Sequence, residues 1–166
     1  YPVTSVGAYA FKNQTGLTSV KIGNNVTRIS SYAFDYCVGL ASIVIPDSVT
    51  NVGNSICYNC AALKEVVLSK NITKLTSFMF SYCPIESIEL HEGITFIGNE
   101  ALEGHKLAEL IIPNSVTEIG YMGIAGAGAP ITKITLGSGL QKLGGLNFSG
   151  KKGLKELISL ATTAPT

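Results

Sequence analysis

Four cysteines are the most chemically reactive side chains in this sequence of 166 residues. Cys57 and Cys60 form a C-x-x-C pair, a spacing found in redox sites and in half of many zinc sites. A zinc site needs four ligands, and the sequence has no second C-x-x-C and no histidine close to this one. We therefore expect no metal and no cofactor, and we interpret the cysteines as buried structural thiols.

Acidic side chains suggest a second kind of chemistry, glycan cleavage, in which two carboxylates lie about 6.5–9.5 Å apart in inverting enzymes. Glu65 and Glu109, with Glu89 between them, are the acids that could form such a pair. However, the chain has no Trp to stack against a sugar, and the residues around these acids predict no apolar setting that would raise a pKa. His91 and His105 have no Ser or Asp partner at a matching position. We predict that the protein is not an enzyme.

Composition excludes other classes of protein. Hydrophobic residues make up 46% of the chain and charged residues 14%, so the chain must bury a core and is not disordered. The net charge of +1 leaves no basic excess for binding nucleic acid. Apolar runs are only a few residues long, far shorter than a membrane span. The chain has no initiator Met and no signal peptide, so we expect a piece of a longer protein.

The chain is built from repeats of 22–24 residues. When the first residue of each L-x-x-V-x-I segment is position 0, apolar residues recur at positions 0, +3, +5, +9, +12 and +17. Of the 42 residues at these six positions, 41 are apolar and only Ser159 is not. The repeats begin at Leu17, Leu40, Leu63, Ile85, Leu107, Ile131 and Leu154.

Each repeat predicts one turn of a coil. Alternation at +3 and +5 predicts a strand over +1 to +5, followed by a turn and a second extended run over +9 to +12. We expect a tight helical or 3₁₀ turn around the small–large pair at +16 and +17, such as Ala33–Phe34. Glycine recurs at +13, where we expect a positive φ or a close backbone approach. These glycines are Gly7, Gly53, Gly98, Gly120 and Gly144.

Stacking is the only way for such short units to bury their apolar residues. Equivalent residues of successive coils then form columns, and the strands form a parallel sheet. We predict a mostly β, right-handed, curved solenoid. Residues 1–16 form a partial repeat, 17–160 the tandem repeats and 161–166 an exit segment. Neither end has a polar cap, so we expect the native protein to continue beyond at least one end, or the terminal coils to pair end to end.

The full pattern, L-x-x-[IV]-x-[IL]-[PG]-x-x-[VI]-T-x-[IVL]-G-x-x-A-F, resembles the BspA-like leucine-rich repeats. LASIVIPDSVTNVG and LAELIIPNSVTEIG show it best. The resemblance implies a leucine-rich-repeat solenoid with its parallel sheet on the concave face. It also implies an exported bacterial protein, extracellular or at the cell surface, that binds a surface or matrix protein of a host or a neighbouring cell. It implies no catalytic residues.

The repeat also places three of the cysteines in one column. Cys37, Cys60 and Cys83 share position +20, so their Cα atoms would lie about 5 Å apart, within reach of a disulfide. We expect stacked free thiols, and a bridge such as Cys37–Cys60 remains the alternative for an exported protein.

A binding surface is predicted on the sheet, where +2 and +4 point outward. These positions predict a mixed apolar and acidic strip, and exposed apolar residues of this kind often mark interaction sites. The alternative is that branched residues are there only because they suit strands. The strip contains Val44, Val67, Ile111, Glu65, Glu89 and Glu109.

A weaker candidate is a set of aromatic residues at +15 and +19, in the turn opposite the sheet. Tyrosine is favoured at interfaces, although these rings could instead pack on one another between coils. The set contains Tyr9, Tyr32, Tyr36, Phe78 and Tyr82. The sequence thus favours an adhesin-like protein-binding module; a spacer or stalk for another domain and a carbohydrate-binding module are the alternatives.

Overall fold

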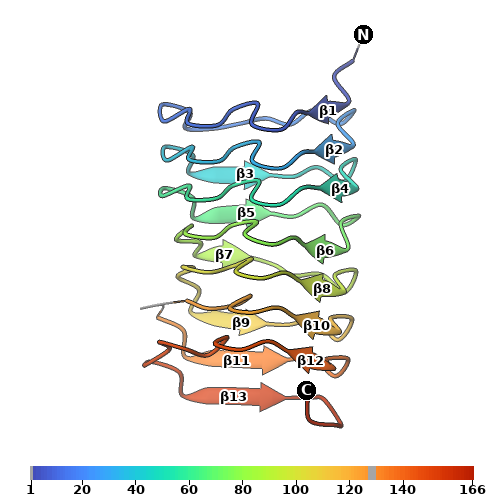
Figure 1. The fold of residues 1–166 in the computed structure, drawn as a ribbon, viewed down its shortest axis with the longest axis vertical. Coiled ribbons are helices and arrows are strands. Elements are labelled where there is room, and N and C mark those ends of the chain that lie inside the picture. The colour runs from blue at the N-terminus through green and yellow to red at the C-terminus, as the bar shows by residue number, and fades with distance from the viewer. Residues whose placement is uncertain (1, 127–129) are drawn as a thin grey trace.

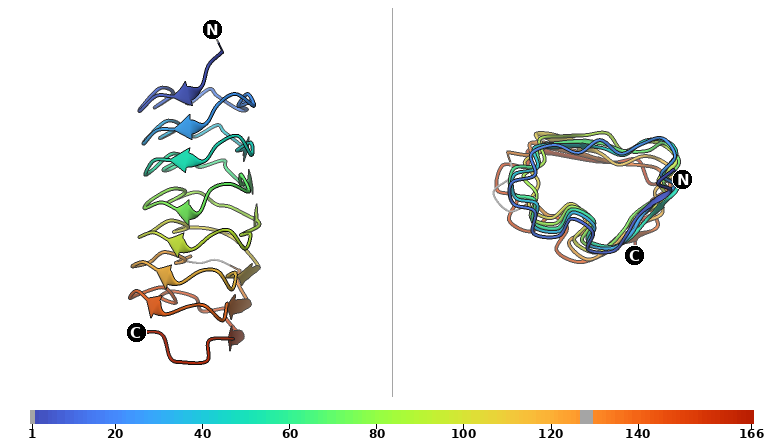
Figure 2. Two further views of the ribbon diagram at one scale, coloured as in Figure 1. Left: turned by 90° about the vertical axis from the view of Figure 1, so that its right-hand side faces the viewer. Right: turned by 90° about the horizontal axis from the view of Figure 1, so that it is seen from above.

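The computed structural model describes residues 2–126 and 130–166, and it forms a stack of coils. Seen along the stack, the coils superimpose around a common outline, with the two ends of the chain at opposite ends of the stack (Figures 1 and 2). The parallel β-solenoid predicted from the repeat is confirmed.

One side of the stack carries strands at positions +2 to +5, and we call it the sheet face. They form two parallel sheets, in the orders β3-β5-β7 and β13-β11-β9, paired in register so that Ser42 lies beside Glu65 and Glu109 beside Lys133. The coil that begins at Leu17 has no strand on this face among its described residues. The strands are β3 (Ser42–Val44), β5 (Glu65–Val67), β7 (Ser87–Ile88), β9 (Glu109–Ile111), β11 (Lys133–Leu136) and β13 (Glu156–Ser159).

A second side carries shorter strands at +11 and +12, inside the extended run predicted from the sequence. They too form two parallel sheets, β1-β2-β4 and β12-β10-β8-β6. The strands are β1 (Ser5–Val6), β2 (Arg28–Ile29), β4 (Asn51–Val52), β6 (Lys74–Leu75), β8 (Phe96–Ile97), β10 (Glu118–Ile119) and β12 (Lys142–Leu143).

The third side consists of tight turns, which differ from the helical or 3₁₀ geometry expected from the sequence. No helix is present in the described part of this side. Instead, positions +15 and +19 have a positive φ, for example 61° at Tyr32 and 57° at Tyr36. Their N–H groups donate to the next coil, Tyr32 N to Asn54 O at 3.0 Å and Tyr36 N to Tyr58 O at 2.9 Å. Hydrogen bonds between coils therefore hold these residues in the left-handed backbone conformation.

The glycines at +13 allow neighbouring coils to approach each other closely, and they do not have a positive φ. A Cβ on Gly98 would lie 2.6 Å from the backbone nitrogen of Ser77 in the preceding coil, and one on Gly144 would lie 2.6 Å from that of Tyr121. Gly7 lies in the first described coil, and a Cβ there would meet nothing within 4 Å. Of the two roles expected for these glycines, the structure supports the close approach.

A single apolar core runs through the stack. The column at +17 includes Phe34 and Phe80, both fully buried. The core columns are more exposed at the terminal coils, where Phe11, at +17, is 41% exposed and Leu157, at +3, is 48% exposed. The depth of burial therefore depends on having a coil on both sides.

Candidate interaction surfaces

The sheet face presents the strip predicted from the sequence. Val44, Val67 and Ile111 are 53%, 55% and 66% exposed, whereas their strand neighbours at +3 are buried. Glu65, Glu89 and Glu109 are exposed as well. The outward direction of all six side chains follows from strand alternation, because +3 and +5 fill the core.

The structure brings four of these six residues around two adjoining hollows of about 290 Å³ each. Val67 and Glu89 line the first; Glu89, Glu109 and Ile111 line the second. Val44 pairs in register with Val67, so it extends the same column. Glu65 lies in register beside Ser87, at the +2 edge of the strip and not among the lining residues.

The second hollow lies where the sheet face is interrupted. β7 and β9 belong to neighbouring coils but to different sheets, and β7 ends at Ile88, before Glu89. The residues that line this hollow come from both sides of the interruption. Sequence periodicity gives no sign of this interruption, because Ile88 and Leu110 satisfy the pattern as well as any other pair.

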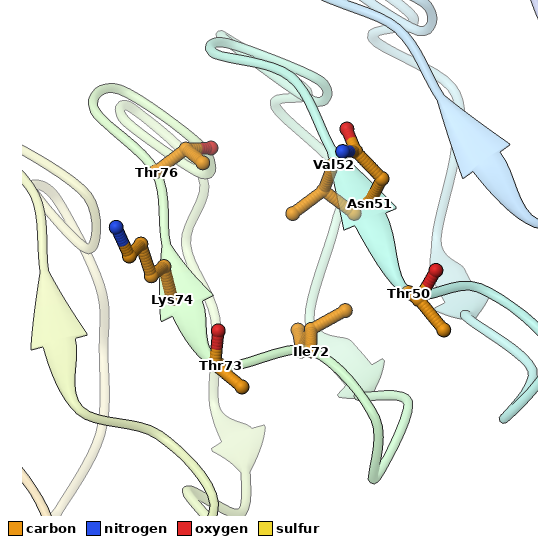
Figure 3. Close-up of a pocket in the computed structure, with 7 residues that line it drawn as sticks. All are labelled: Thr50, Asn51, Val52, Ile72, Thr73, Lys74 and Thr76. Atoms are coloured by element: carbon orange, nitrogen blue, oxygen red, sulfur yellow. The ribbon is translucent and has the colours of Figure 1, made fainter.

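A third hollow, of about 250 Å³, lies on the second side between β4 and β6, which also belong to different sheets (Figure 3). Thr76 stands at +13 in this coil, where five other repeats have Gly. Its Oγ1 donates to Gly53 O at 2.7 Å, so a side chain bridges the two coils here. Thr76 and its hydrogen bond to Gly53 therefore lie at the point where the strand pairing is interrupted.

The aromatic residues form a second surface, on the turn side. Tyr9 and Tyr32 stack with ring centroids 4.9 Å apart, which confirms that rings of this set pack on one another between coils. Tyr36 and Tyr82 are linked through Tyr58, with centroid distances of 5.8 and 5.5 Å. Tyr58 was not predicted to belong to this surface, because it stands at +18 and the predicted aromatic positions are +15 and +19. Phe78 is half-buried.

An ion pair at this surface was also missed. Lys12 Nζ lies 2.8 Å from Oδ2 of Asp35, whose side chain is only 3% exposed. The ammonium also lies over the rings of Tyr9 and Tyr32, 5.5 and 5.9 Å from their centroids. Hydrogen bonding to Asp35 raises the pKa of Lys12. The sequence did contain a signal for this ion pair, because Lys12 and Asp35 have opposite charges and stand at +18 in successive repeats.

All four cysteines are free thiols buried in the core. Each thiol of the +20 column donates to a backbone carbonyl of the preceding coil, Cys37 to Phe11 O at 3.0 Å and Cys83 to Cys57 O at 2.8 Å. Burial raises the pKa of Cys37 to about 11. Hydrogen bonding with the neighbouring Cys57 and Cys83 side chains lowers the pKa of Cys60, which is nevertheless fully buried.

We expect no cysteine to react with a thiol reagent such as DTNB while the protein is folded, because a reagent must reach the sulfur as well as find a thiolate. After unfolding in guanidinium chloride without reductant, four thiols per chain should be titrated. A count of two would instead establish a disulfide and contradict the free-thiol arrangement.

The histidines have structural partners, and neither is hydrogen-bonded to a Ser or Asp side chain in the described part of the chain. His91 Nε2 lies 3.0 Å from Ser69 O, and its Nδ1 accepts a hydrogen bond from Gly93 N. His105 is fully buried, with Nε2 3.2 Å from Ile124 O. Within residues 2–126 and 130–166, no group of three or more His, Cys, Asp or Glu side chains could hold a metal ion. The same residues include no helix long and apolar enough to cross a membrane.

Comparisons with known proteins agree with this architecture. The structure resembles a leucine-rich repeat protein of T. pallidum, with 25% identity and a TM-score of 0.73 over 86% of this chain and 72% of that one. It also resembles a leucine-rich cell surface protein of Faecalibacterium prausnitzii, with 25% identity and a TM-score of 0.54; 90% of this chain matches 36% of that protein. No curated protein matches the sequence.

The family profile of the BspA-type leucine-rich repeat region matches residues 2–106 and 78–163, with six copies. These ranges contain both the sheet face and the turn side. The chain therefore belongs to the family of BspA-type leucine-rich repeat proteins.

Proposed function

We propose that this chain is a non-enzymatic protein-binding module of an exported bacterial surface protein, and that it binds through the strip on the sheet face. The observation that carries the proposal is the exposure of Val44, Val67 and Ile111, each more than half exposed, on a single outward column. Exposed apolar side chains grouped on one face are characteristic of interaction sites. The cell-surface location described for the F. prausnitzii protein supports the exported setting.

The chemistry of the strip favours a protein as partner over a glycan. The hollows beside Glu89 are lined mainly by aliphatic and acidic side chains, with Lys70, Ser87 and His91 also lining the first, and they contain no Phe, Tyr or Trp ring on which a sugar could stack. Branched apolar side chains can bury area at the centre of an interface. Glu65 and Glu109 border this column at +2, and Glu89 stands within it, between Val67 and Ile111. The expected partner is a surface or matrix protein of a host or neighbouring cell, with basic side chains beside an apolar centre.

The test is a triple variant, Val44→Glu, Val67→Glu and Ile111→Glu, screened with the unchanged chain against immobilised extracellular-matrix and cell-surface proteins. A partner that uses the strip should bind the variant about 100-fold or more weakly, because burying a charge at an interface centre costs several kcal/mol. Circular dichroism should show the fold retained, since all three side chains point to solvent.

The matched control adds the same three charges elsewhere, as Asn51→Glu, Thr73→Glu and Gln141→Glu on exposed residues of the second side. The control should bind like the unchanged chain. Equal loss in both variants would show a general charge effect, and retained binding in the strip variant would place the site elsewhere. Failure to bind any protein, or any member of a glycan panel, would favour a spacer.

A further inference from the structure

The aromatic column at +15 has a gap of one ring. Tyr9, Tyr32 and Phe78 stand at this position in their coils, but the coil between Tyr32 and Phe78 has Ser55. Ser55 has the same left-handed backbone, with φ of 57° against 61° at Tyr32 and 58° at Phe78. The fold is therefore continuous through Ser55, and only the ring is absent.

This gap is the floor of a pocket of about 340 Å³. Tyr32 and Phe78 are separated by two coil spacings, roughly 10 Å, whereas a planar group in van der Waals contact on both sides needs about 7–8 Å, so one such group fits with space to spare. We call this pocket the aromatic slot. It is lined by Lys12, Tyr32, Asp35, Tyr36, Ser55, Tyr58 and Phe78.

Asp35 gives the aromatic slot a charge and an unused hydrogen-bond acceptor. Its side chain is 3% exposed, and only Oδ2 is engaged, by Lys12. Oδ1 is buried and has no hydrogen-bond partner among the described residues. A buried carboxylate oxygen left without a donor costs free energy, and a donor supplied by a ligand would remove that cost.

Lys12 provides an example, within this chain, of a cation bound by Asp35 and the tyrosine rings. The Lys12 ammonium pairs with Asp35 and lies over two tyrosine rings on the N-terminal side of the slot. On the C-terminal side, the charge of Glu103 is the main cause that raises the pKa of Tyr82, with a further contribution from Glu100. Acidic groups therefore border the aromatic rings on the side that Lys12 does not occupy.

We propose that the aromatic slot binds the guanidinium group of an arginine side chain from a protein partner. A guanidinium is planar, so it fits the space that the missing ring leaves. It is cationic, so it is attracted to aromatic faces and to Asp35, and it has N–H donors for Oδ1. A lysine ammonium shares the charge but is not planar, and a quaternary ammonium has no donor. This site is independent of the strip on the sheet face.

The experiment measures binding of single capped amino acids to the whole chain by saturation-transfer NMR and by titration of the tyrosine ring signals. The probes are N-acetyl-arginine methylamide, the lysine equivalent, and the citrulline equivalent, which keeps the planar shape and loses the charge. The arginine probe should bind with a dissociation constant at least fivefold lower than either of the others. Equal binding of citrulline and arginine would overturn the proposal.

Two variants locate the site. Ser55→Tyr puts a ring into the gap on a backbone that already accepts tyrosine at Tyr9 and Tyr32, so it should fold, melt at the same or a higher temperature, and lose arginine binding by tenfold or more. Asp35→Asn should weaken arginine binding fivefold or more and leave citrulline binding unchanged. Asp47→Asn, which removes an equal charge from a distant turn, is the control and should bind arginine normally. Unchanged arginine binding in a folded Ser55→Tyr variant would exclude the slot.

Discussion

Replacing Phe80 with alanine should lower the free energy of unfolding by about 3–5 kcal/mol. The Phe80 side chain is fully buried at +17, and the coils on both sides contribute to its surroundings through Cys57 and Leu102 at the same position. Neither of these neighbours is large enough to fill the space of a lost ring. In a stack where each coil contacts only its neighbours, the cavity also weakens two interfaces at once. Urea unfolding followed by circular dichroism measures the effect.

Phe11→Ala is the matched control, because Phe11 occupies the same position in the first coil and is 41% exposed. It should cost no more than about half as much as Phe80→Ala, since much of the ring already contacts water. The two variants also separate loss of stability from loss of cooperativity, because decoupled coils would lower the slope of the urea transition. Equal costs at both sites would contradict the dependence of burial on neighbouring coils.

Acidification should destabilise the protein through His105. Burial is the main cause that lowers the pKa of His105 to about 4, and the positive charges of Lys151 and Lys106 contribute to the lowering. The geometry agrees: His105 Nδ1 accepts a hydrogen bond from Leu107 N at 3.1 Å, and Lys151 Nζ lies 3.3 Å from Nε2. Protonation of Nδ1 would break the bond to Leu107 and put a second positive charge beside Lys151.

The direction of the pH effect follows from the lowered pKa. In the unfolded chain His105 takes up a proton near the ordinary histidine pKa of 6.5, but the folded protein resists protonation down to about 4. Stability from this residue is therefore complete above pH 6.5 and is lost as the pH falls from 6.5 to 4, by about 3 kcal/mol in total. Urea unfolding at several pH values over this range measures the loss.

His105→Cys is the informative variant, because it puts into this repeat the residue that stands at +20 in three others. The difference in stability between the unchanged chain and this variant should vary with pH by about 3 kcal/mol between pH 6.5 and 4. Carboxylates titrate in the same range in both proteins, so the difference isolates the histidine. A His91→Gln variant keeps His105 and should keep the acid-induced loss. A pH-independent difference would mean that His105 is protonated without cost.

The sequence predicted those features that repeat. The core columns, both strand positions and the close approach at Gly98 all follow from residues that recur every 22–24 positions. The sheet interruptions did not follow, because they depend on how two neighbouring coils fit together, and that fit is visible only in the stacked structure. The positive φ at Tyr32 and Phe78 was also missed, because aromatic residues rarely adopt it and the bonds that hold it come from another coil.

The two candidate surfaces also differ in how far they could be predicted from the sequence. The outward direction of Val44, Val67 and Ile111 needed only strand alternation. Predicting the aromatic slot would have required three features: the pairing of Lys12 with Asp35, the position of Tyr58 and the missing ring at Ser55. None of them changes the repeating pattern of apolar residues. The residues most informative about function in this chain are those that differ from the other residues at the same repeat position. What such a residue does depends on the side chains that the adjacent coils place beside it.

The left-handed residues on the turn side have a consequence for the order in which the chain folds. Each costs roughly 1–2 kcal/mol in a non-glycine residue, and the hydrogen bond that holds it comes from the following coil, as Tyr32 N to Asn54 O shows. A coil synthesised first must therefore wait for its successor before its turn becomes stable. Folding then has a slow nucleation step that needs at least two complete coils, followed by rapid addition of further coils.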